Sequence, residues 1–198
     1  DRDWFPSLLD RRHRVAVAWT ARVGETAEET GLGPIFNDLD VTASLRAASG
    51  APYTPTNLRP EGLLSAAGSD PHPGLSPATP YDPNGDGRLD ADEINSERMP
   101  WSWSIDVGLR RPFRFLGQRF AVSAEMRNVL NRKNPRVVYG ATGEADDDGW
   151  LATAAGRQWL GANAAVAEER RLAYEERLDD PNRYEAGRSV AARLSWEF

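Results

Sequence analysis

The chain has 198 residues, enough for one domain of ordinary size, with 27% charged residues and a net charge of −6 at pH 7. Its mean hydropathy is −0.60, and no run of about 18 apolar residues exists, so the sequence excludes a transmembrane helix. The absence of a basic stripe argues against nucleic acid as a partner. Cysteine is absent, which suits either a cytosolic protein or an exported chain that crosses an oxidising compartment unfolded.

Two segments near the N-terminus alternate between apolar and polar side chains. In residues 13–23 the odd positions are mostly apolar, whereas the even positions are small or charged. Residues 38–48 repeat the pattern, with Leu45 on one face and Arg46 on the other. A period of two predicts a β-strand with one face exposed to water. The connection between these strands, residues 24–37, is somewhat long for a turn.

The next connection, residues 49–100, is very long and holds the sharpest chemical motif. Asp82–Glu93 fits D-x-[DN]-x-[DN]-G-x₅-E, the pattern of an EF-hand calcium loop. Gly87 permits the sharp turn, and Leu89 stands where such loops bury an aliphatic side chain. The expected oxygen ligands of Ca²⁺ are the side chains of five residues and the backbone carbonyl of Arg88: Asp82, Asn84, Asp86, Arg88, Asp90 and Glu93.

Two readings of this motif stay open. An Asp/Gly-rich surface turn forms without any metal, and "LSPATPY" before the motif predicts no incoming helix, so a paired EF-hand domain is excluded. If Ca²⁺ binds, its role is to stiffen a long loop, with the weak affinity, about 10⁻⁴ to 10⁻³ M, of extracellular sites. A second acidic run, Asp146–Asp147–Asp148–Gly149, is interpreted as the start of a helix.

Three further strands are predicted toward the C-terminus, in residues 101–110, 120–127 and 189–198. The connection 111–119 is short, whereas 131–187 is very long. Within the long connection, residues 156–178 are rich in helix formers and predict a surface helix with charge pairs. That helix is either a decoration of the loop, or a substrate lid or docking surface for a partner lipoprotein.

The five strands run over about nine to eleven residues, the length that crosses a bilayer when tilted. A soluble β-sandwich also alternates, but here aromatic residues gather at strand ends, as in the girdles of outer-membrane barrels. We therefore predict an all-β fold, an antiparallel transmembrane β-barrel segment of about five C-terminal strands with long extracellular loops, one partly helical. Its polar face carries a mixed set of charges that we interpret as structural ion pairs: Arg14, Arg22, Arg46, Arg110, Arg127, Arg193, Asp38, Asp40, Asp106, Glu125 and Glu197.

The sequence resembles the closing strands of TonB-dependent outer-membrane receptors. The resemblance covers most of the chain. It rests on the strand opening "DRRHRVAVAW" (10–19), the loop "SGAPYTP" (49–55), the corner "EMRNVLNRKNP" (125–135) and the end "DPNRYEAGRSVAARLSWEF" (180–198). Asn128–Val129–Leu130–Asn131 matches the family's "N-L-F-N" corner. Two departures are Gly187, where many relatives have proline, and the lack of a plug domain and TonB box.

The resemblance implies a place in the Gram-negative cell outer membrane, with the C-terminus periplasmic and residues 49–100 and 131–187 outside the cell. Its implied partners are outer-membrane lipid, the remainder of the barrel and plug, TonB through the missing N-terminal part, and the barrel-assembly machinery through Phe198. Five strands cannot close a barrel alone, so residues 1–198 are expected to be the C-terminal part of a larger barrel.

The expected function is nutrient uptake, with siderophore, vitamin, glycan and peptide substrates all left open. The alternatives are a calcium-stabilised surface binding or adhesion barrel without active transport, and a secreted soluble β-protein with a calcium loop. No enzyme is expected, because His13 and His72 are the only histidines and no nucleophile motif is present.

Overall fold

The structure, a computed structural model, describes residues 4–23, 37–57 and 79–197. The chain divides into two compact units. The first, called the sheet unit here, comprises residues 13–48, 102–133 and 186–198. The second, called the loop unit, comprises residues 1–12, 49–101 and 134–185.

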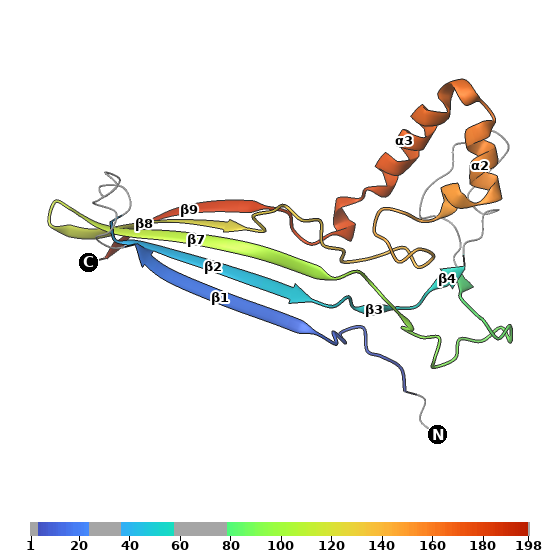
Figure 1. Ribbon diagram of the computed structural model, residues 1–198, viewed down its shortest axis with the longest axis horizontal. Coiled ribbons are helices and arrows are strands. Elements are labelled where there is room, and N and C mark those ends of the chain that lie inside the picture. The colour runs from blue at the N-terminus through green and yellow to red at the C-terminus, as the bar shows by residue number, and fades with distance from the viewer. Residues whose placement is uncertain (1–3, 24–36, 58–78, 198) are drawn as a thin grey trace. The chain divides into compact units, whose positions relative to one another are not determined.

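The sheet unit is one antiparallel sheet of five strands in the order β1-β2-β7-β8-β9 (Figure 1). The strands are β1 (Arg14–Val23), β2 (Leu39–Ala48), β7 (Ser102–Phe115), β8 (Gln118–Arg127) and β9 (Ser189–Glu197). Strands dominate the secondary structure, which confirms the all-β class and the antiparallel pairing. The sheet is not closed in the part of the chain that the structure describes.

The strand register brings the large aliphatic and aromatic side chains of the five strands to one face. One row across the five strands consists of Trp19, Ala43, Val107, Met126 and Val190, each paired with the next. Because side chains alternate between the two faces of a sheet, the residues between these positions fill the opposite face. The alternation predicted for each strand is therefore in phase across the whole sheet.

A second row shows the polar face: Arg22, Asp40, Arg110, Ser123 and Arg193 are successive register partners. Every residue of this row is charged or carries a hydroxyl. The sheet therefore separates its side chains into an apolar face and a polar face.

Strand β7 is longer than the sequence suggested. Its predicted end lay near Arg110, but the strand continues to Phe115 and turns tightly through Leu116 and Gly117 into β8. Both turn residues have positive φ, 50° and 76°, as the type I′ hairpin turn requires. Arg111 interrupts the apolar alternation, and this interruption explains why the pattern appeared to stop there.

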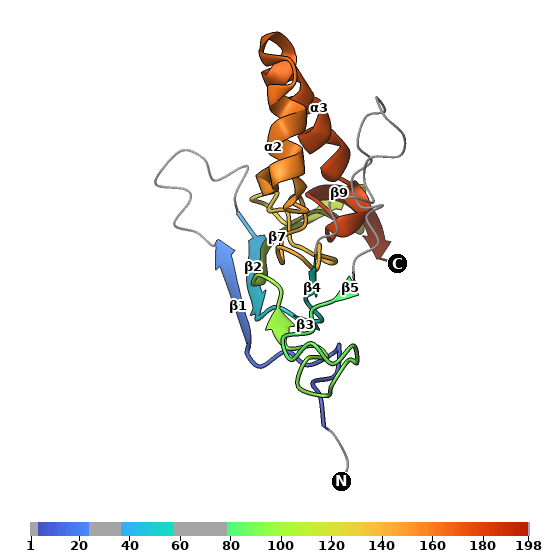
Figure 2. The same ribbon diagram turned by 90° about the vertical axis from the view of Figure 1, so that its right-hand side faces the viewer.

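The loop unit is built from short elements. Two helices, α2 (Ala154–Gly161) and α3 (Ala167–Leu178), lie side by side (Figure 2). Two small ribbons pair β3 (Pro52–Tyr53) with β6 (Glu97–Arg98) and β4 (Thr56–Asn57) with β5 (Thr79–Pro80). Among the residues that the structure describes, 3₁₀ turns cover Trp150–Ala152, Ala164–Val166 and Pro181–Arg183.

The helical stretch expected over 156–178 is thus divided in two. Thr153 caps the start of α2 by accepting the N–H of Gly156 at 3.1 Å, and α3 ends at Leu178. Trp150, Tyr174 and Leu178 form a buried core, against which Tyr139, Leu151 and Trp159 pack. Among the described residues, no helix is both long enough and apolar enough to cross a membrane.

Candidate functional site

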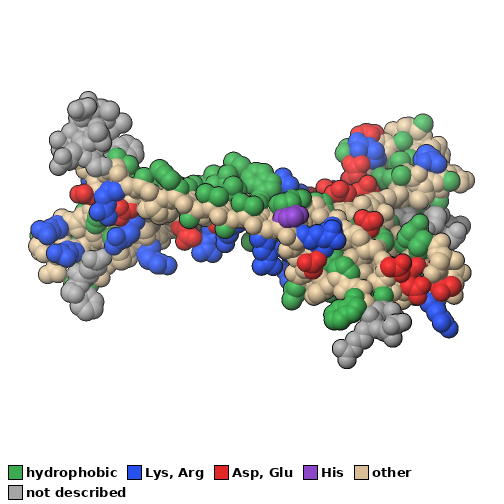
Figure 3. Space-filling model, turned by 60° about the horizontal axis from the view of Figure 1, so that its bottom comes forward, with side chains coloured by type: hydrophobic (Ala, Val, Ile, Leu, Met, Phe, Trp, Pro, Cys, Tyr) green, Lys and Arg blue, Asp and Glu red, His purple; other side chains and the backbone are tan. Residues whose placement is uncertain are grey.

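The apolar face of the sheet unit is exposed. Trp19 is 55% exposed, Val17 54% and Leu194 66%. In Figure 3 hydrophobic side chains form a continuous band along the sheet. The largest fully buried hydrophobic side chains that the structure describes, such as Trp150 and Tyr174, belong to the loop unit. The described part of the sheet unit therefore has no hydrophobic core of its own.

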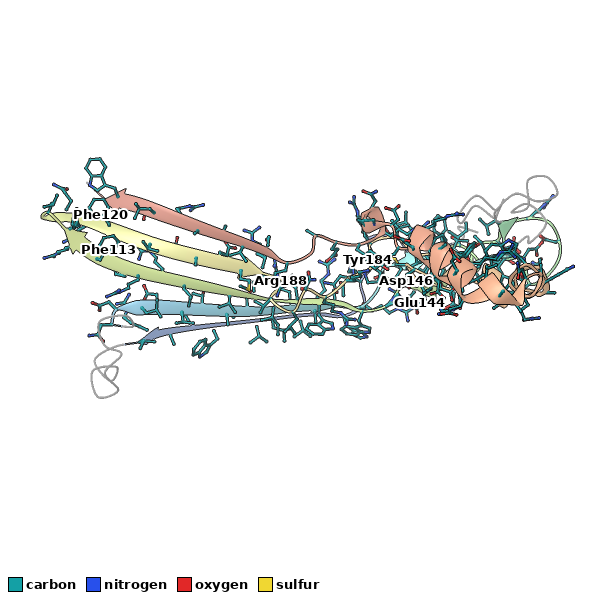
Figure 4. All side chains as sticks on the ribbon, turned by 90° about the horizontal axis from the view of Figure 1, so that it is seen from above. Phe113, Phe120, Glu144, Asp146, Tyr184 and Arg188 are labelled. Atoms are coloured by element: carbon teal, nitrogen blue, oxygen red, sulfur yellow. The ribbon has the colours of Figure 1, made fainter. Side chains whose placement is uncertain are left out.

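Aromatic rings gather at the hairpin end of this apolar face. Phe120 on β8 stacks against Phe113 on β7, with ring centroids 5.6 Å apart, and against Trp196 on β9, at 6.4 Å. Phe115 meets Phe120 edge-on at 6.5 Å. Figure 4 places Phe113 and Phe120 on adjacent strands at that end of the sheet. Toward the start of β7, the guanidinium of Arg132 lies over the ring of Trp103, 4.9 Å from its centroid.

The polar face holds the ion pairs that the sequence predicted. Arg22 Nε lies 2.6 Å from Asp40 Oδ1, and Arg127 Nε lies 2.7 Å from Glu125 Oε1. Two further pairs join β2 to β7: Arg46 with Asp106, and Arg110 with Asp40, whose closest atoms are 4.0 Å apart.

This face is hollowed. The hollow is lined by side chains from all five strands, among them Arg22, Asp40, Asp106, Glu125 and Arg193. The other residues of the predicted mixed-charge set lie on these strands or at their ends, although the side chain of Glu197 and the whole of Phe198 lie outside the description. The hollow offers charges of both signs to a polar solute or to another polar segment of protein.

A tight asparagine corner follows β8. Asn128 and Asn131 both have left-handed backbones, with φ of 48° and 50°, a conformation that asparagine tolerates better than most residues. The Asn128 side chain accepts the N–H of Arg132 at 3.0 Å and donates to the Arg132 carbonyl at 2.9 Å. Its backbone N–H reaches Asp106 Oδ1 at 2.9 Å. Asp106 therefore joins the polar face to this corner.

The six residues of the calcium-type loop are all described. Asp82 accepts the backbone N–H of Gly85 on Oδ1 at 2.6 Å and that of Gly87 on Oδ2 at 2.8 Å. Both glycines have left-handed backbones. The Asp86 and Asn84 side chains likewise accept amides two residues on, from Arg88 at 2.8 Å and from Asp86 at 3.0 Å. These hydrogen bonds fold the loop tightly around its first acidic residue.

The second half of the loop is partly brought to the first. Asn84 Nδ2 donates to Asp90 Oδ2 at 2.9 Å, and Glu93 Oε2 accepts the N–H of Asp90 at 3.0 Å. Glu93 is only 6% exposed. In the described ranges, no three acidic or histidine side chains are grouped so that they could hold a metal ion. Hydrogen bonds thus link Asn84, Asp86, Arg88, Asp90 and Glu93 in series, whereas the Asp82 carboxylate binds the backbone of the two glycines.

Sequence reasoning missed the residue that follows this loop. Asn95 has a left-handed backbone, φ 54°, and is 7% exposed. Its N–H donates to Thr54 Oγ1 at 3.0 Å, and its side chain donates to the carbonyl of Pro6 at 2.7 Å. The only local signal was the asparagine itself, a residue type that adopts a left-handed backbone more readily than most. The two hydrogen-bond partners of Asn95 are 41 and 89 residues away in the chain.

Arg98 makes the next link. It forms an ion pair with Asp10 and donates to the carbonyls of Asp10 and Gly50 at 3.0 and 3.3 Å. Asn95 and Arg98 together attach the N-terminal segment to the calcium-type loop within the loop unit.

No protein-family model, curated protein or solved structure matches the chain.

Proposed function

We propose that this chain is the C-terminal barrel part of a TonB-dependent outer-membrane transporter for nutrient uptake. The observation that supports the proposal best is the exposed apolar face, opposite a polar face with ion pairs. Apolar area left in water forgoes about 25 cal/mol per Å², so a band of exposed Trp, Val and Leu side chains needs a cover. Lipid covers such a band in an outer-membrane barrel, while the polar face lines the interior.

The strand dimensions and the aromatic cluster agree with this placement. The five strands have 9 to 14 residues, and a tilted strand needs about 9 to 11 to cross a bilayer. The stacked rings of Phe113, Phe120 and Trp196 suit a membrane–water interface, where outer-membrane barrels carry aromatic girdles.

The two edge strands of the sheet, β1 and β9, need further hydrogen-bonding partners in a membrane. In the described chain, β1 and β9 each pair on one side only. Lipid satisfies no backbone hydrogen bonds, so the proposed transporter needs further strands on both edges. These belong to the remainder of the barrel, which encloses a plug and couples to TonB. Phe198, the proposed signal to the assembly machinery, lies outside the described residues.

A pair of adjacent substitutions on β1 tests the proposal. Val17 lies on the apolar face and Ala18 on the polar face, and both are exposed. In lipid, Val17→Arg is expected to cost about 2–4 kcal/mol and Ala18→Arg much less. In a soluble protein, both exposed positions tolerate arginine equally. The measurement is the yield of detergent-extracted, heat-modifiable protein in outer-membrane fractions.

The proposal fails if the two variants behave alike or if the unmodified protein fractionates without membranes or detergent.

We also propose that Asp82, Asn84, Asp86, Asp90 and Glu93, with the Arg88 carbonyl, bind Ca²⁺ and stiffen the loop, with no catalytic role. The spacing of the oxygen-bearing residues in Asp82–Glu93, which fits the calcium-loop pattern, supports that proposal. A calcium-stabilised surface binding barrel without transport is the second candidate, favoured by the same loop.

A further inference from the structure

The calcium-type loop contains the one Asn–Gly pair of the sequence, Asn84–Gly85. Both residues are exposed. Asparagine is a chemically labile residue, and it is most labile before glycine, because glycine has no side chain to obstruct the ring closure that removes the amide. Asn84 is therefore a candidate for a covalent change that needs no enzyme and no reactant other than water.

This change is deamidation through a cyclic imide. The nitrogen of Gly85 loses its proton and bonds to Cγ of Asn84, the Cγ–Nδ2 bond breaks, and ammonia leaves with that proton. Water then opens the ring. Attack at Cγ leaves an aspartate at position 84, whereas attack at the backbone carbonyl carbon leaves an isoaspartate, whose main chain runs through Cβ. Either product adds a negative charge to the loop.

The folded loop blocks the first step of this reaction. Gly85 donates its N–H to Asp82 Oδ1 at 2.6 Å. Because an imide nitrogen is planar, Cγ of Asn84 has to take the direction in which the N–H of Gly85 points. The Asp82 carboxylate occupies that direction. Its negative charge also disfavours loss of the proton from the nitrogen, since two like charges would then be in contact.

The Asn84 side chain is held at both of its polar atoms. Its Oδ1 accepts the N–H of Asp86 at 3.0 Å, and its Nδ2 donates to Asp90 Oδ2 at 2.9 Å. The second oxygen of Asp82 accepts the N–H of Gly87 at 2.8 Å and so closes the same turn. Ring closure therefore requires the loop to open, and Asp82 accepts two of the hydrogen bonds that keep it closed.

We propose that Asn84 is a latent deamidation site that the Asp82 carboxylate protects, so that opening of the loop is recorded by an irreversible covalent change. Exposed loops open locally without unfolding of the whole protein, and the rate of deamidation follows the fraction of time that this loop is open. An isoaspartate inserts an extra backbone atom between Asp82 and Asp86, and the original turn cannot form again. The inference concerns this loop alone and does not rest on the transport function.

The test follows the amide of Asn84 in the full chain. The protein is incubated in mildly alkaline buffer with EDTA, so that calcium does not affect the result. Mass spectrometry of proteolytic peptides measures the loss of the amide, and chromatography separates the aspartate and isoaspartate products. We expect the folded protein to react about tenfold more slowly, or slower still, than the same protein unfolded in urea. Asp82→Ala should raise the rate in the folded protein about tenfold, because a hydrogen bond to a charged group is lost.

Asp92→Ala is the matched control. It removes an exposed carboxylate from the same loop, but one that accepts none of the four hydrogen bonds described above, and the rate should not change. Asn95, which precedes Ser96 and is 7% exposed, is an internal monitor that stays intact unless the loop unit itself unfolds.

Three results would overturn the inference: equal rates in the folded protein and in urea, an unchanged rate in Asp82→Ala, or no reaction at Asn84 in urea. Reaction at Asn95 together with Asn84 in the Asp82→Ala variant would count against it as well. That outcome would mean that the whole unit unfolds, whereas the inference requires local opening of the loop.

Discussion

The hydroxyl of Tyr174 on α3 donates a 2.7 Å hydrogen bond to Oδ2 of Asp148, and both residues are almost completely buried. The other oxygen of the same carboxylate accepts the N–H of Trp150 at 3.0 Å. The rings of Trp150 and Tyr174 stack with centroids 5.2 Å apart. One acidic side chain thus holds helix α3 onto the acidic run that precedes the 3₁₀ turn at Trp150.

Tyr174→Phe should destabilise the loop unit by about 1–3 kcal/mol, because it leaves a buried carboxylate short of one hydrogen bond. Urea unfolding, followed by tryptophan fluorescence, measures the change. Tyr81→Phe is the matched control, since Tyr81 is exposed and should change nothing. If both variants unfold at the same urea concentration as the parent, the Tyr174–Asp148 bond has no structural role.

The loop unit should lose stability in strong base. Burial, together with Asp148, raises the pKa of Tyr174, and burial, together with nearby Asp146, raises the pKa of Tyr184 to about 12; Figure 4 labels Tyr184 and Asp146. Each raised pKa means that the folded state holds the phenol proton more tightly than the unfolded state. The stabilisation is complete below pH 10 and is lost as the pH rises from 10 toward 12.

Circular dichroism of the helices against pH checks this expectation. Tyr184→Phe should make the loss above pH 10 shallower, because one of the two groups no longer titrates. A pH profile identical to that of the parent would contradict the assignment of Tyr184.

Calcium should order the Asp82–Glu93 loop if the predicted ligand set is right. We expect Ca²⁺ binding by calorimetry at about 10⁻⁴ to 10⁻³ M, lost with Asp82→Ala and Glu93→Ala together. Asp92→Ala, an exposed acidic residue outside the ligand set, is the control and should bind normally. Binding that survives the double substitution would exclude this loop as the site.

Gly50→Ala should disrupt the start of the 49–101 segment of the loop unit. A Cβ at position 50 would lie 1.6 Å from the carbonyl oxygen of Met99, and this clash with backbone forces apart the segments that Arg98 joins. A loss above 2 kcal/mol, on the order of a severe core mutation, is expected in thermal unfolding. Gly161→Ala meets no atom within 4 Å and, at the end of a helix, should be neutral or slightly stabilising.

The strands could be predicted because their information is local. At most strand ends, the period of two located the boundary to within about one residue. The register then aligned the apolar faces of neighbouring strands, as the pattern required. The extension of β7 was missed because Arg111 breaks the alternation. The break between α2 and α3 was also missed, although Gly161 and Asn163 are weak helix formers. The Asn163 side chain accepts the N–H of Ala165 at 3.2 Å and so caps the next turn.

The site was less predictable because its contacts are long-range. The D-x-N-x-D-G spacing located the calcium-type loop, but nothing local indicated that Asn95 reaches Pro6 or that Arg98 reaches Asp10 across 88 residues. Likewise, composition could not reveal that Arg114 would stand opposite Arg119, which follows only from the two-residue turn. Pairings of this kind depend on where strands end, the least certain feature of a sequence pattern.

Pro112 lies on β7 two residues past the last partner of β2. A proline has no N–H to donate, so a foreign strand that approached the open side of the hairpin could not complete a ladder there. The extension is thus protected against edge-to-edge association between copies of the chain, even though it is long, aromatic and exposed. Replacement of Pro112 by a residue with a backbone N–H would restore the missing donor and remove this protection.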